Sequence, residues 1–294
     1  MENMTAKISA FVRAYHINNS NIKIYNDRYA TKILYDEEYK EIYKNLKEGI
    51  KFFNPNYNGN NPVGYIVNNY IGPTVIFRSA FNYKYLMNEI KLGLKQYVLL
   101  GSGYDTISYL VNNLVKVFEL DKESVIEDKI NRINNLKISN NNVCYVGVDF
   151  NVGFINQLLN NKFDKNLKTM ISILGVSYYL DKNVFFNMLN SIGDILSVGS
   201  IILFDYPSEY NDSDKNRVLA SGAKEEMKSV IKYLDIVEFC DKNNFYIVEN
   251  VDYKNIEKYY FYDYNTINPD NLLKVIKDVN CCVLVKKWYN IFVI

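Results

Sequence analysis

Hydrophobic positions in the first 95 residues repeat with the spacing of helices. Between Tyr39 and Phe53, apolar side chains recur at intervals of three and four residues, and a segment containing proline and glycine at 54–61 ends the pattern. A second run of the same kind extends from Phe77 to Leu94. Such a stripe is typical of an amphipathic helix, so this part of the chain is predicted to be helical.

After about residue 95 the pattern changes to short apolar runs separated by helix-like segments. Seven runs have the length and composition of buried strands. They are QYVLL (96–100), KVFEL (116–120), VCYVGVDF (143–150), TMISILGV (169–176), SIILFDY (200–206), NFYIVENV (244–251) and CCVLVKK (281–287). Strands that alternate with helices form crossover units. The sequence therefore predicts an α/β fold with a seven-stranded, mostly parallel sheet and helices on both faces.

Two segments are expected to cover one edge of this sheet. We predict that residues 1–92 form an N-terminal helical cap and that residues 93–294 form the core. The stretch at 207–234 is longer than a plain crossover, so we predict a helical lid insertion over the carboxyl edge, where open α/β sheets bind ligands. The whole chain, 1–294, fits a single domain made of one core and these additions.

Composition argues against several classes of protein. The chain has 34 basic and 33 acidic side chains, a formal net charge of +1 and 48% hydrophobic residues, which disfavours disorder and nucleic acid as the main partner. The sequence shows neither the roughly 18 consecutive apolar residues of a membrane span nor a signal peptide. Its four cysteines lack CxxC and Cys/His spacing. We expect a cytoplasmic protein with reduced thiols, no metal and no membrane partner.

The strongest chemical signal follows the first predicted strand. There the chain reads GSGYDT from Gly101 to Thr106, and a helical pattern begins near Ile107. Gly101 and Gly103 would let a ligand approach backbone N–H groups that a Cβ would block. The next strand ends at Asp121, twenty positions after Gly101, where a carboxylate can accept both hydroxyls of a ribose. This arrangement predicts a nucleoside site at the carboxyl ends of the first two strands.

The same turn discriminates between nucleotide-type ligands. A dinucleotide fingerprint has a third glycine three residues after the second, but here that position is Thr106, preceded by Asp105. A carboxylate there would repel a pyrophosphate and would suit a cationic nucleoside such as S-adenosylmethionine. Asp105 also fits the simpler role of a helix cap, and the two roles are compatible. An NAD(P)-dependent oxidoreductase shares the strand, the glycine turn and the distal acid, and is the alternative.

The chain resembles the leucine carboxyl methyltransferase-like family of class I S-adenosylmethionine-dependent methyltransferases, including the bacterial O-methyltransferases of polyketide biosynthesis. The sharpest match is QYVLLGSGYDT, which is close to the family's QxVxLGxGxDT. Further matches are VFELD (117–121), Lys129, VGVDF (146–150), LGVSYYL (174–180), FDY (204–206) and, near the N-terminus, Thr5, Ala6, Arg13 and Ala14. The resemblance covers most of the chain and implies a Rossmann-like methyltransferase fold with S-adenosylmethionine as the cofactor.

The resemblance also implies roles for two cations and marks one departure. Arg78, in the helix before the first strand, would pair with the methionine carboxylate of the cofactor, a geometry that guanidinium suits. Lys7 would reach the same carboxylate. Many family members carry an acid before the glycine of the fourth-strand motif, where this chain has Leu174. The cofactor or the acceptor would therefore be held differently near Leu174, or the acceptor would be apolar.

Other matched residues would hold the rest of the cofactor. By the same resemblance, Gly101 and Gly103 would pass under its methionine part, and Asp121 would hold its ribose. Asp149 and Phe150 would flank the adenine, with the acid accepting the hydrogens of the N6 amino group.

Three residues are candidates for a general base, which a phenol or alcohol acceptor would need and a carboxylate would not. They are Tyr178, His16 and Tyr206. His16, the only histidine, fits a buried, hydrogen-bonded residue better than a base. Tyr178 and Tyr179 continue an apolar strand run, so we expect at least one in the core, while the other could point into an acceptor pocket.

The leading hypothesis is an S-adenosylmethionine-dependent enzyme that methylates a carboxylate or hydroxyl oxygen of a small molecule. A protein that binds S-adenosylmethionine without catalysis is a further alternative, suggested by Leu174.

Overall fold

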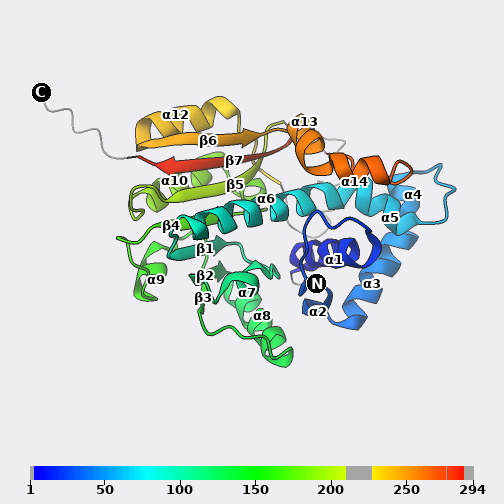
Figure 1. Cartoon of the computed structure of the whole chain (residues 1–294), viewed down its shortest axis with the longest axis horizontal. Helices are drawn as coiled ribbons and strands as arrows, with labels where there is room; N and C mark the ends of the chain where they lie inside the picture. The colour runs from blue at the N-terminus through cyan, green and yellow to red at the C-terminus, as the bar shows by residue number, and fades with distance from the viewer. Residues whose placement is uncertain (1–2, 210–226, 276, 288–294) are drawn as a thin grey trace, which may run out of the picture.

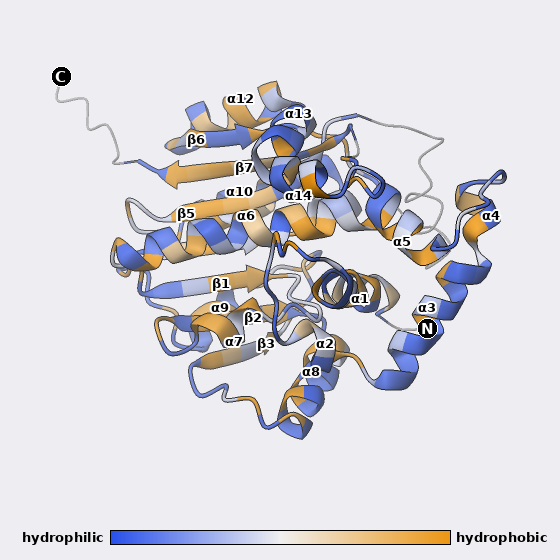
Figure 2. Ribbon diagram, turned by 45° about the vertical axis from the view of Figure 1, so that its right-hand side comes forward, coloured by the Kyte–Doolittle hydropathy of each residue, from blue (hydrophilic) through white to orange (hydrophobic). Residues whose placement is uncertain are grey.

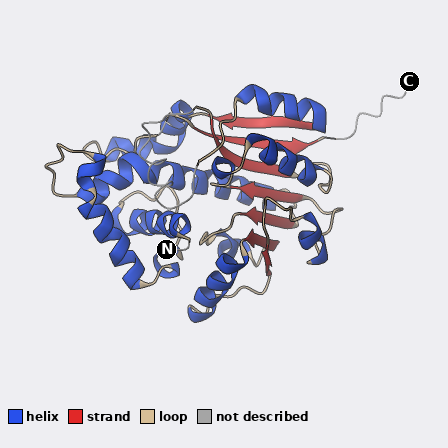
Figure 3. Cartoon of the chain, turned by 180° about the vertical axis from the view of Figure 1, so that it is seen from behind, coloured by secondary structure: helices blue, strands red, loops and turns tan. Residues whose placement is uncertain are grey.

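The computed structural model describes residues 3–209, 227–275 and 277–287 (Figure 1). Helices cover both faces of a central sheet, and a group of N-terminal helices lies beyond one of its edges, as the view from behind also shows (Figure 3). In the described part of the chain, no helix combines the length and the apolar character that a membrane crossing requires.

Seven strands form the sheet in the order β3-β2-β1-β4-β5-β7-β6. Their bounds are β1 Gln96–Leu100, β2 Lys116–Asp121, β3 Val143–Gly147, β4 Thr169–Ile173, β5 Ile201–Pro207, β6 Phe245–Val251 and β7 Val279–Lys286. The pairs among β1 to β5 are parallel, while β7 runs antiparallel to both of its neighbours. The prediction of a seven-stranded, mostly parallel sheet is confirmed.

The N-terminal region of the chain is helical, as predicted. It consists of α1 Met4–Asn19, α2 Ala30–Ile33, α3 Asp36–Glu48, α4 Ile50–Phe53, α5 Pro62–Ile66, a π-helical turn at Val67–Ile71 and α6 Gly72–Lys91. Figure 2 shows β1 pointing toward α1. These helices therefore lie at the carboxyl end of the strands, where the cap was expected.

The remaining helices connect the strands or follow them. They are α7 Ile107–Val111, α8 Glu123–Asn135, α9 Ile155–Asn160, α10 Lys182–Gly193, α12 Tyr233–Asn243, α13 Tyr253–Ile256 and α14 Tyr262–Ile267, with a 3₁₀ turn at Ser177–Tyr179 and a π-helical turn at Glu257–Phe261.

Two apolar cores hold helices against the sheet, one on each face. On one face, Phe77 and Phe81 of α6 are fully buried in the same cluster as Leu99 of β1. On the other face, Leu189 of α10 packs in a cluster with Val98. Side chains of neighbouring strand residues point to opposite faces, so every strand residue of β1 is buried and the run reads as continuously apolar.

The strand predicted at 169–176 is shorter in the structure. β4 ends at Ile173, and Gly175 follows with φ at +69°, a left-handed conformation that takes the chain out of the sheet. Tyr178 and Tyr179 lie on the 3₁₀ turn instead. The prediction that they continue a strand was wrong, because an apolar run alone does not distinguish a strand from a buried turn.

Two other predicted elements end early for local reasons. The run at 143–150 is a strand only to Gly147, since the carbonyl of Asp149 accepts two later backbone N–H groups in a turn. The helix predicted at 39–53 is two helices, α3 and α4, which meet at Gly49.

Residues 210–226 of the predicted lid insertion lie outside the described residues. The part that follows them runs beside the turn after β4, where the Lys228 N–H donates to the Tyr178 carbonyl at 2.7 Å. The Ile231 N–H donates to the Pro207 carbonyl at 2.9 Å, and α12 begins soon afterwards. This segment therefore lies against the ends of β4 and β5.

Candidate functional site

The glycine turn after β1 has the conformation that its sequence predicts. Gly101 and Gly103 have φ values of +69° and +43°, in the region that disfavours residues with a Cβ. A Cβ on Gly101 would lie 2.3 Å from Cγ2 of Val176, so the turn packs closely against the segment after β4. A Cβ on Gly103 would lie 3.2 Å from the Cβ of Ala6 in α1. The turn is thus enclosed by the segment after β4 on one side and by α1 of the cap on the other.

Asp121 lies beside this turn, as expected. One carboxylate oxygen accepts the Gly103 N–H at 2.7 Å, and the other accepts the Lys122 N–H at 2.7 Å. Burial raises the pKa of Asp121, although these two hydrogen bonds and the charge of Lys129 act in the opposite direction. The end of β2 therefore brings a carboxylate to within hydrogen-bond distance of the glycine backbone.

A buried ion pair between α8 and β2 contacts the glycine turn. The Nζ of Lys129 in α8 lies 2.6 Å from Oε2 of Glu119 in β2, and neither side chain is exposed to solvent. The same Nζ lies 3.5 Å from the carbonyl oxygen of Ser102, inside the turn. Sequence reasoning noted Lys129 only as a matching position and did not connect it with Glu119.

The cap is fastened to the turn through a second buried pair. Nε of Arg13 in α1 lies 2.8 Å from Oδ2 of Asp27, and Nη2 donates to the carbonyl of Tyr104 at 2.7 Å. Asp27 also accepts a hydrogen bond from the hydroxyl of Thr106. Burial alone would lower the pKa of Arg13, but the charges of Asp105 and Asp27 outweigh it and raise that pKa. One arginine thus joins α1 to both the loop after it and the glycine turn.

The side chain of Asp105 bonds the first residue of α7. Its Oδ1 accepts the Ile107 N–H at 2.9 Å, at the start of α7. This bond resembles the predicted cap, although the N-cap residue itself is Thr106. The contribution of the Asp105 charge to binding a cationic cofactor stays a prediction.

Arg78 of α6 reaches the ends of β4 and β5. Its Nη1 lies 3.3 Å from Oδ2 of Asp205, and its Nη2 donates to the hydroxyl of Ser9 at 3.3 Å. The Arg78 side chain is 16% exposed, whereas Asp205 is fully buried. The other Asp205 oxygen accepts the Gly175 N–H at 2.6 Å. Burial raises the pKa of Asp205, and the positive charge of Arg78 opposes that shift.

Sequence reasoning missed Asp205 as a site residue. A signal was present, because an acid inside a strand that is otherwise apolar must have a partner when it is buried.

Asp149 and Phe150 follow β3, next to the end of β2. Asp149 is exposed, and its Oδ1 accepts the backbone N–H of Asn151 at 2.9 Å. Phe150 is half-buried and packs edge-on against Phe154, with ring centres 5.6 Å apart. Leu174 is buried at the end of β4 in the core cluster shared with α6. Their roles toward a cofactor stay predictions.

Lys7 is paired within the cap. Its Nζ lies 2.8 Å from Oε1 of Glu38 in α3, and Glu38 also accepts two hydrogen bonds from Arg132. A contact between Lys7 and a cofactor carboxylate stays a prediction.

His16 is buried with both ring nitrogens engaged. Nε2 accepts the Ile24 N–H at 3.0 Å, so the neutral ring carries its hydrogen on Nδ1, which lies 3.0 Å from the Ser20 hydroxyl. Burial, helped by Lys23, lowers the pKa of His16 to about 4. This arrangement fits the hydrogen-bonded interpretation and leaves no free lone pair for a general base.

The two tyrosine candidates differ in their surroundings. The hydroxyl of Tyr206 donates to Oδ1 of Asn250 at 2.8 Å. The hydroxyl of Tyr178 is buried and has no hydrogen-bond partner within the described ranges. Burial raises the pKa of both phenols, and the charge of Asp205 adds to the shift at Tyr178. Neither ionises readily, but Tyr178 keeps an unused donor near Asp205.

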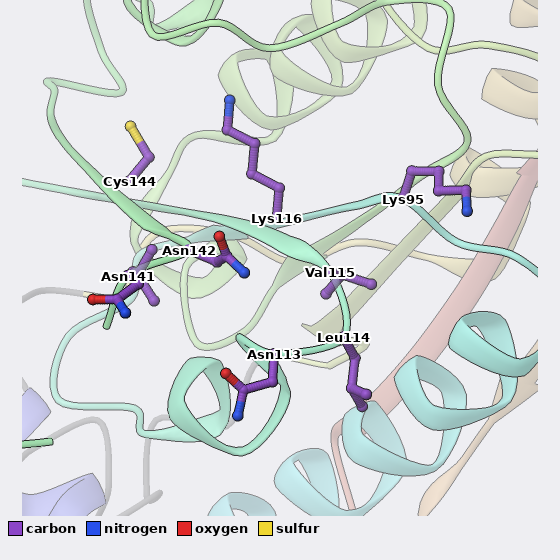
Figure 4. A pocket seen from close by; sticks show the side chains of 9 residues that line it. Lys95, Asn113, Leu114, Val115, Lys116, Asn141, Asn142 and Cys144 are labelled. Atoms are coloured by element: carbon purple, nitrogen blue, oxygen red, sulfur yellow. The ribbon is translucent and has the colours of Figure 1, made fainter. Parts of the chain in front are cut away.

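A pocket of about 340 Å³ lies at the opposite edge of the sheet (Figure 4). Its lining includes Lys95, Lys116 and Val143, which stand at the amino ends of β1, β2 and β3. It is therefore separate from the residues around Gly101 and Asp121. The residues that the structure describes contain no group of three metal-ligating side chains that could hold an ion.

Comparisons with known proteins show which family the chain belongs to. The model of the leucine carboxyl methyltransferase family matches residues 6–193. The chain belongs to this family. A protein of Bacillus subtilis described as an S-adenosyl-L-methionine-dependent methyltransferase, YktD, is 31% identical over 276 residues, which cover 88% of this chain and 91% of YktD.

Two solved structures share the fold. A DUF574 family protein of Streptomyces avermitilis superposes with a TM-score of 0.61 at 13% identity, covering 96% of this chain and 97% of that protein. The magnesium protoporphyrin IX methyltransferase of Synechocystis, solved with bound S-adenosylhomocysteine, gives a TM-score of 0.51 at 9% identity, covering 84% and 99%. These likenesses show the Rossmann-like fold of class I. The family match and the relative YktD identify the chain as an S-adenosylmethionine-dependent methyltransferase.

The residues at the carboxyl edge fit this cofactor chemically. Gly101 and Gly103 keep side chains out of the turn, and Asp121 supplies a carboxylate that can accept hydroxyl hydrogens. Arg78 supplies a partly exposed guanidinium for a carboxylate. Asp121 lies at the end of β2, and Arg78 lies two strands away at the end of β4. This separation of an anion and a cation matches a ligand that carries a ribose at one end and an amino acid at the other.

Proposed function

We propose that this methyltransferase transfers the methyl group to an oxygen of a small molecule and that a carboxylate is the favoured acceptor. Arg78 binds the methionine carboxylate of the cofactor, Asp121 binds its ribose, and Asp149 with Phe150 flanks its adenine. When bound, S-adenosylmethionine supplies a methyl group on a positively charged sulfur, ready for displacement in line.

One observation supports a carboxylate over a hydroxyl acceptor: none of the three candidate bases is poised to take a proton. His16 uses its acceptor nitrogen on Ile24, and Tyr206 donates to Asn250. Tyr178 has its pKa raised by burial and by Asp205. A phenol or alcohol needs a base near its operating pH, whereas a carboxylate is already ionised at neutral pH.

The chain's own contribution is then mainly orientation. Holding two reactants in line can supply several kcal/mol, up to roughly 7 to 11 in well-oriented cases. Tyr178 suits this role, because its hydroxyl has no partner among the described residues and can donate to an acceptor oxygen without being deprotonated.

Product chemistry tests the proposal. The protein is incubated with S-adenosylmethionine labelled in the methyl group and with matched carboxylic acids and phenols, and each product is treated with mild base. A methyl ester releases labelled methanol under these conditions, and a methyl ether does not. We expect base-labile products, with a rate nearly independent of pH between 6 and 8.

Base-stable products formed at a rate that rises with pH would show that the acceptor is a hydroxyl group and not a carboxylate. Cofactor binding without transfer to any member of the panel would favour the non-catalytic alternative.

A further inference from the structure

The position of Arg78 depends on one buried acid. We propose that Asp205 is a positioning residue that holds the Arg78 guanidinium at the ends of β4 and β5, in the orientation that receives the carboxylate of the cofactor. This inference rests on the role of Arg78 in the proposed function.

Both oxygens of Asp205 are used for this purpose. Oδ2 lies 3.3 Å from Nη1 of Arg78, and Oδ1 accepts the Gly175 N–H at 2.6 Å. The carboxylate therefore ties the guanidinium to the backbone of the turn after β4. Because Asp205 is fully buried in the middle of the sheet, this anchor is held rigidly by its surroundings.

Gly175 completes the seat for the guanidinium. A Cβ at this position would lie 2.7 Å from Nη1 of Arg78 and 3.1 Å from its Cζ, so the guanidinium rests directly against the backbone. The φ of +69° at Gly175 also favours glycine here, since residues with a side chain rarely adopt this value. Ser9 of α1 contacts the far nitrogen, Nη2, at 3.3 Å.

Enough donors remain for a ligand. A guanidinium carries five N–H groups, two of them on each terminal nitrogen. Among the residues that the structure describes, Asp205 takes one hydrogen from Nη1 and Ser9 takes one from Nη2, which leaves one on each terminal nitrogen and one on Nε. With 16% of the side chain exposed, Arg78 can bind a second carboxylate while Asp205 keeps it in place.

The charges are consistent with this role. The buried pair is neutral, so Asp205 offsets the cost of keeping Arg78 away from water. The contact also fixes a long side chain in one rotamer, which lowers the entropy lost on binding. Without Asp205, Arg78 would keep its charge and lose its orientation.

Two ligands distinguish positioning from general structural support. S-adenosylhomocysteine contains the amino acid carboxylate, whereas methylthioadenosine has the same adenosine and sulfur without the amino acid part. Titration calorimetry with both compounds is done on the wild type, Asp205→Asn, Arg78→Ala and the double variant. Asp263→Asn, at an exposed position of α14, is the matched control for loss of one acid.

We expect Asp205→Asn and Arg78→Ala each to weaken the binding of S-adenosylhomocysteine at least tenfold and to change the affinity for methylthioadenosine less than twofold. The double variant should bind S-adenosylhomocysteine within threefold of Arg78→Ala, because the two residues act as a unit. Asp263→Asn should match the wild type with both ligands.

The inference is overturned if Asp205→Asn binds S-adenosylhomocysteine as the wild type does, or if it stays folded and loses both ligands equally. If Asp205→Asn does not fold, Ser9→Ala tests the same seat: a twofold to fivefold loss confined to S-adenosylhomocysteine supports it, and no loss contradicts it. A wild type that binds neither compound would overturn the proposed function itself.

Discussion

Replacement of Arg13 tests how the cap is joined to the glycine turn. Arg13→Met keeps most of the side-chain length and removes the charge, which leaves the fully buried carboxylate of Asp27 without its cationic partner. Breaking a buried pair from one side costs about 3 to 5 kcal/mol, and losing the hydrogen bond to the Tyr104 carbonyl adds about 1 kcal/mol. We expect the free energy of unfolding to fall by about 4 to 6 kcal/mol.

Thermal and urea unfolding at pH 7 measure this loss. A protein of this size should lose about 2 to 4 °C of melting temperature per kcal/mol, so Arg13→Met should melt roughly 8 to 24 °C lower. Lys44→Met is the control, since it breaks an exposed pair with Glu48 at 3.9 Å. Such a pair contributes about 0.5 kcal/mol or less.

A double variant separates charge from packing. Arg13→Met with Asp27→Asn removes both charges and keeps an oxygen that can accept from the loop N–H groups of Tyr29 and Ala30. It should be more stable than Arg13→Met alone. The reasoning is refuted if Arg13→Met costs no more than Lys44→Met, or if the second substitution adds its own full loss to the first.

Three further predictions concern the turn and the charges around it. Gly103→Ala should weaken S-adenosylhomocysteine binding in calorimetry at least tenfold, because a Cβ there is strained at φ +43° and presses on Ala6; unchanged affinity would contradict this. Burial would raise the pKa of Glu38, but hydrogen bonds from Arg132 and Lys7 outweigh it and lower that pKa to about 2. The stabilisation from Glu38 is therefore complete above about pH 4.5 and is lost as the pH falls toward 2. Glu38→Gln should flatten that part of an acid unfolding curve, and an unchanged curve would refute the prediction. Lys129→Met should destabilise the protein by about 3 to 5 kcal/mol in urea unfolding, because Glu119 is left as an unpaired buried charge; the loss should shrink when Glu119→Gln is added, and a larger loss would contradict the reasoning.

The sequence was most informative where a property is local. A glycine turn after an apolar strand predicted the conformation at Gly101 and Gly103, and the spacing to Asp121 placed that acid beside the turn. The strand runs were visible because a parallel sheet buried on both faces is apolar throughout. The resemblance to the family added Arg78, which the structure places at the same edge.

Pairings between distant segments were not predictable in this way. Asp205 and Arg78 are 127 positions apart, and only the strand order and the course of α6 bring them together. The pair formed by Asp27 and Arg13 depends on how a loop folds back on α1. Turn geometry also limited the prediction for Tyr178, because the left-handed conformation of Gly175 ends the strand. The glycine itself was the one sign of this turn in an otherwise apolar run.

Calorimetry with S-adenosylhomocysteine tests most directly the claim that the carboxyl edge of this sheet is the cofactor site. The wild type, Arg78→Ala and Asp121→Ala are compared under one set of conditions, with folding checked by circular dichroism. We predict binding to the wild type and at least a tenfold loss in each variant. Undiminished binding in both folded variants would show that the cofactor lies elsewhere and would contradict the account.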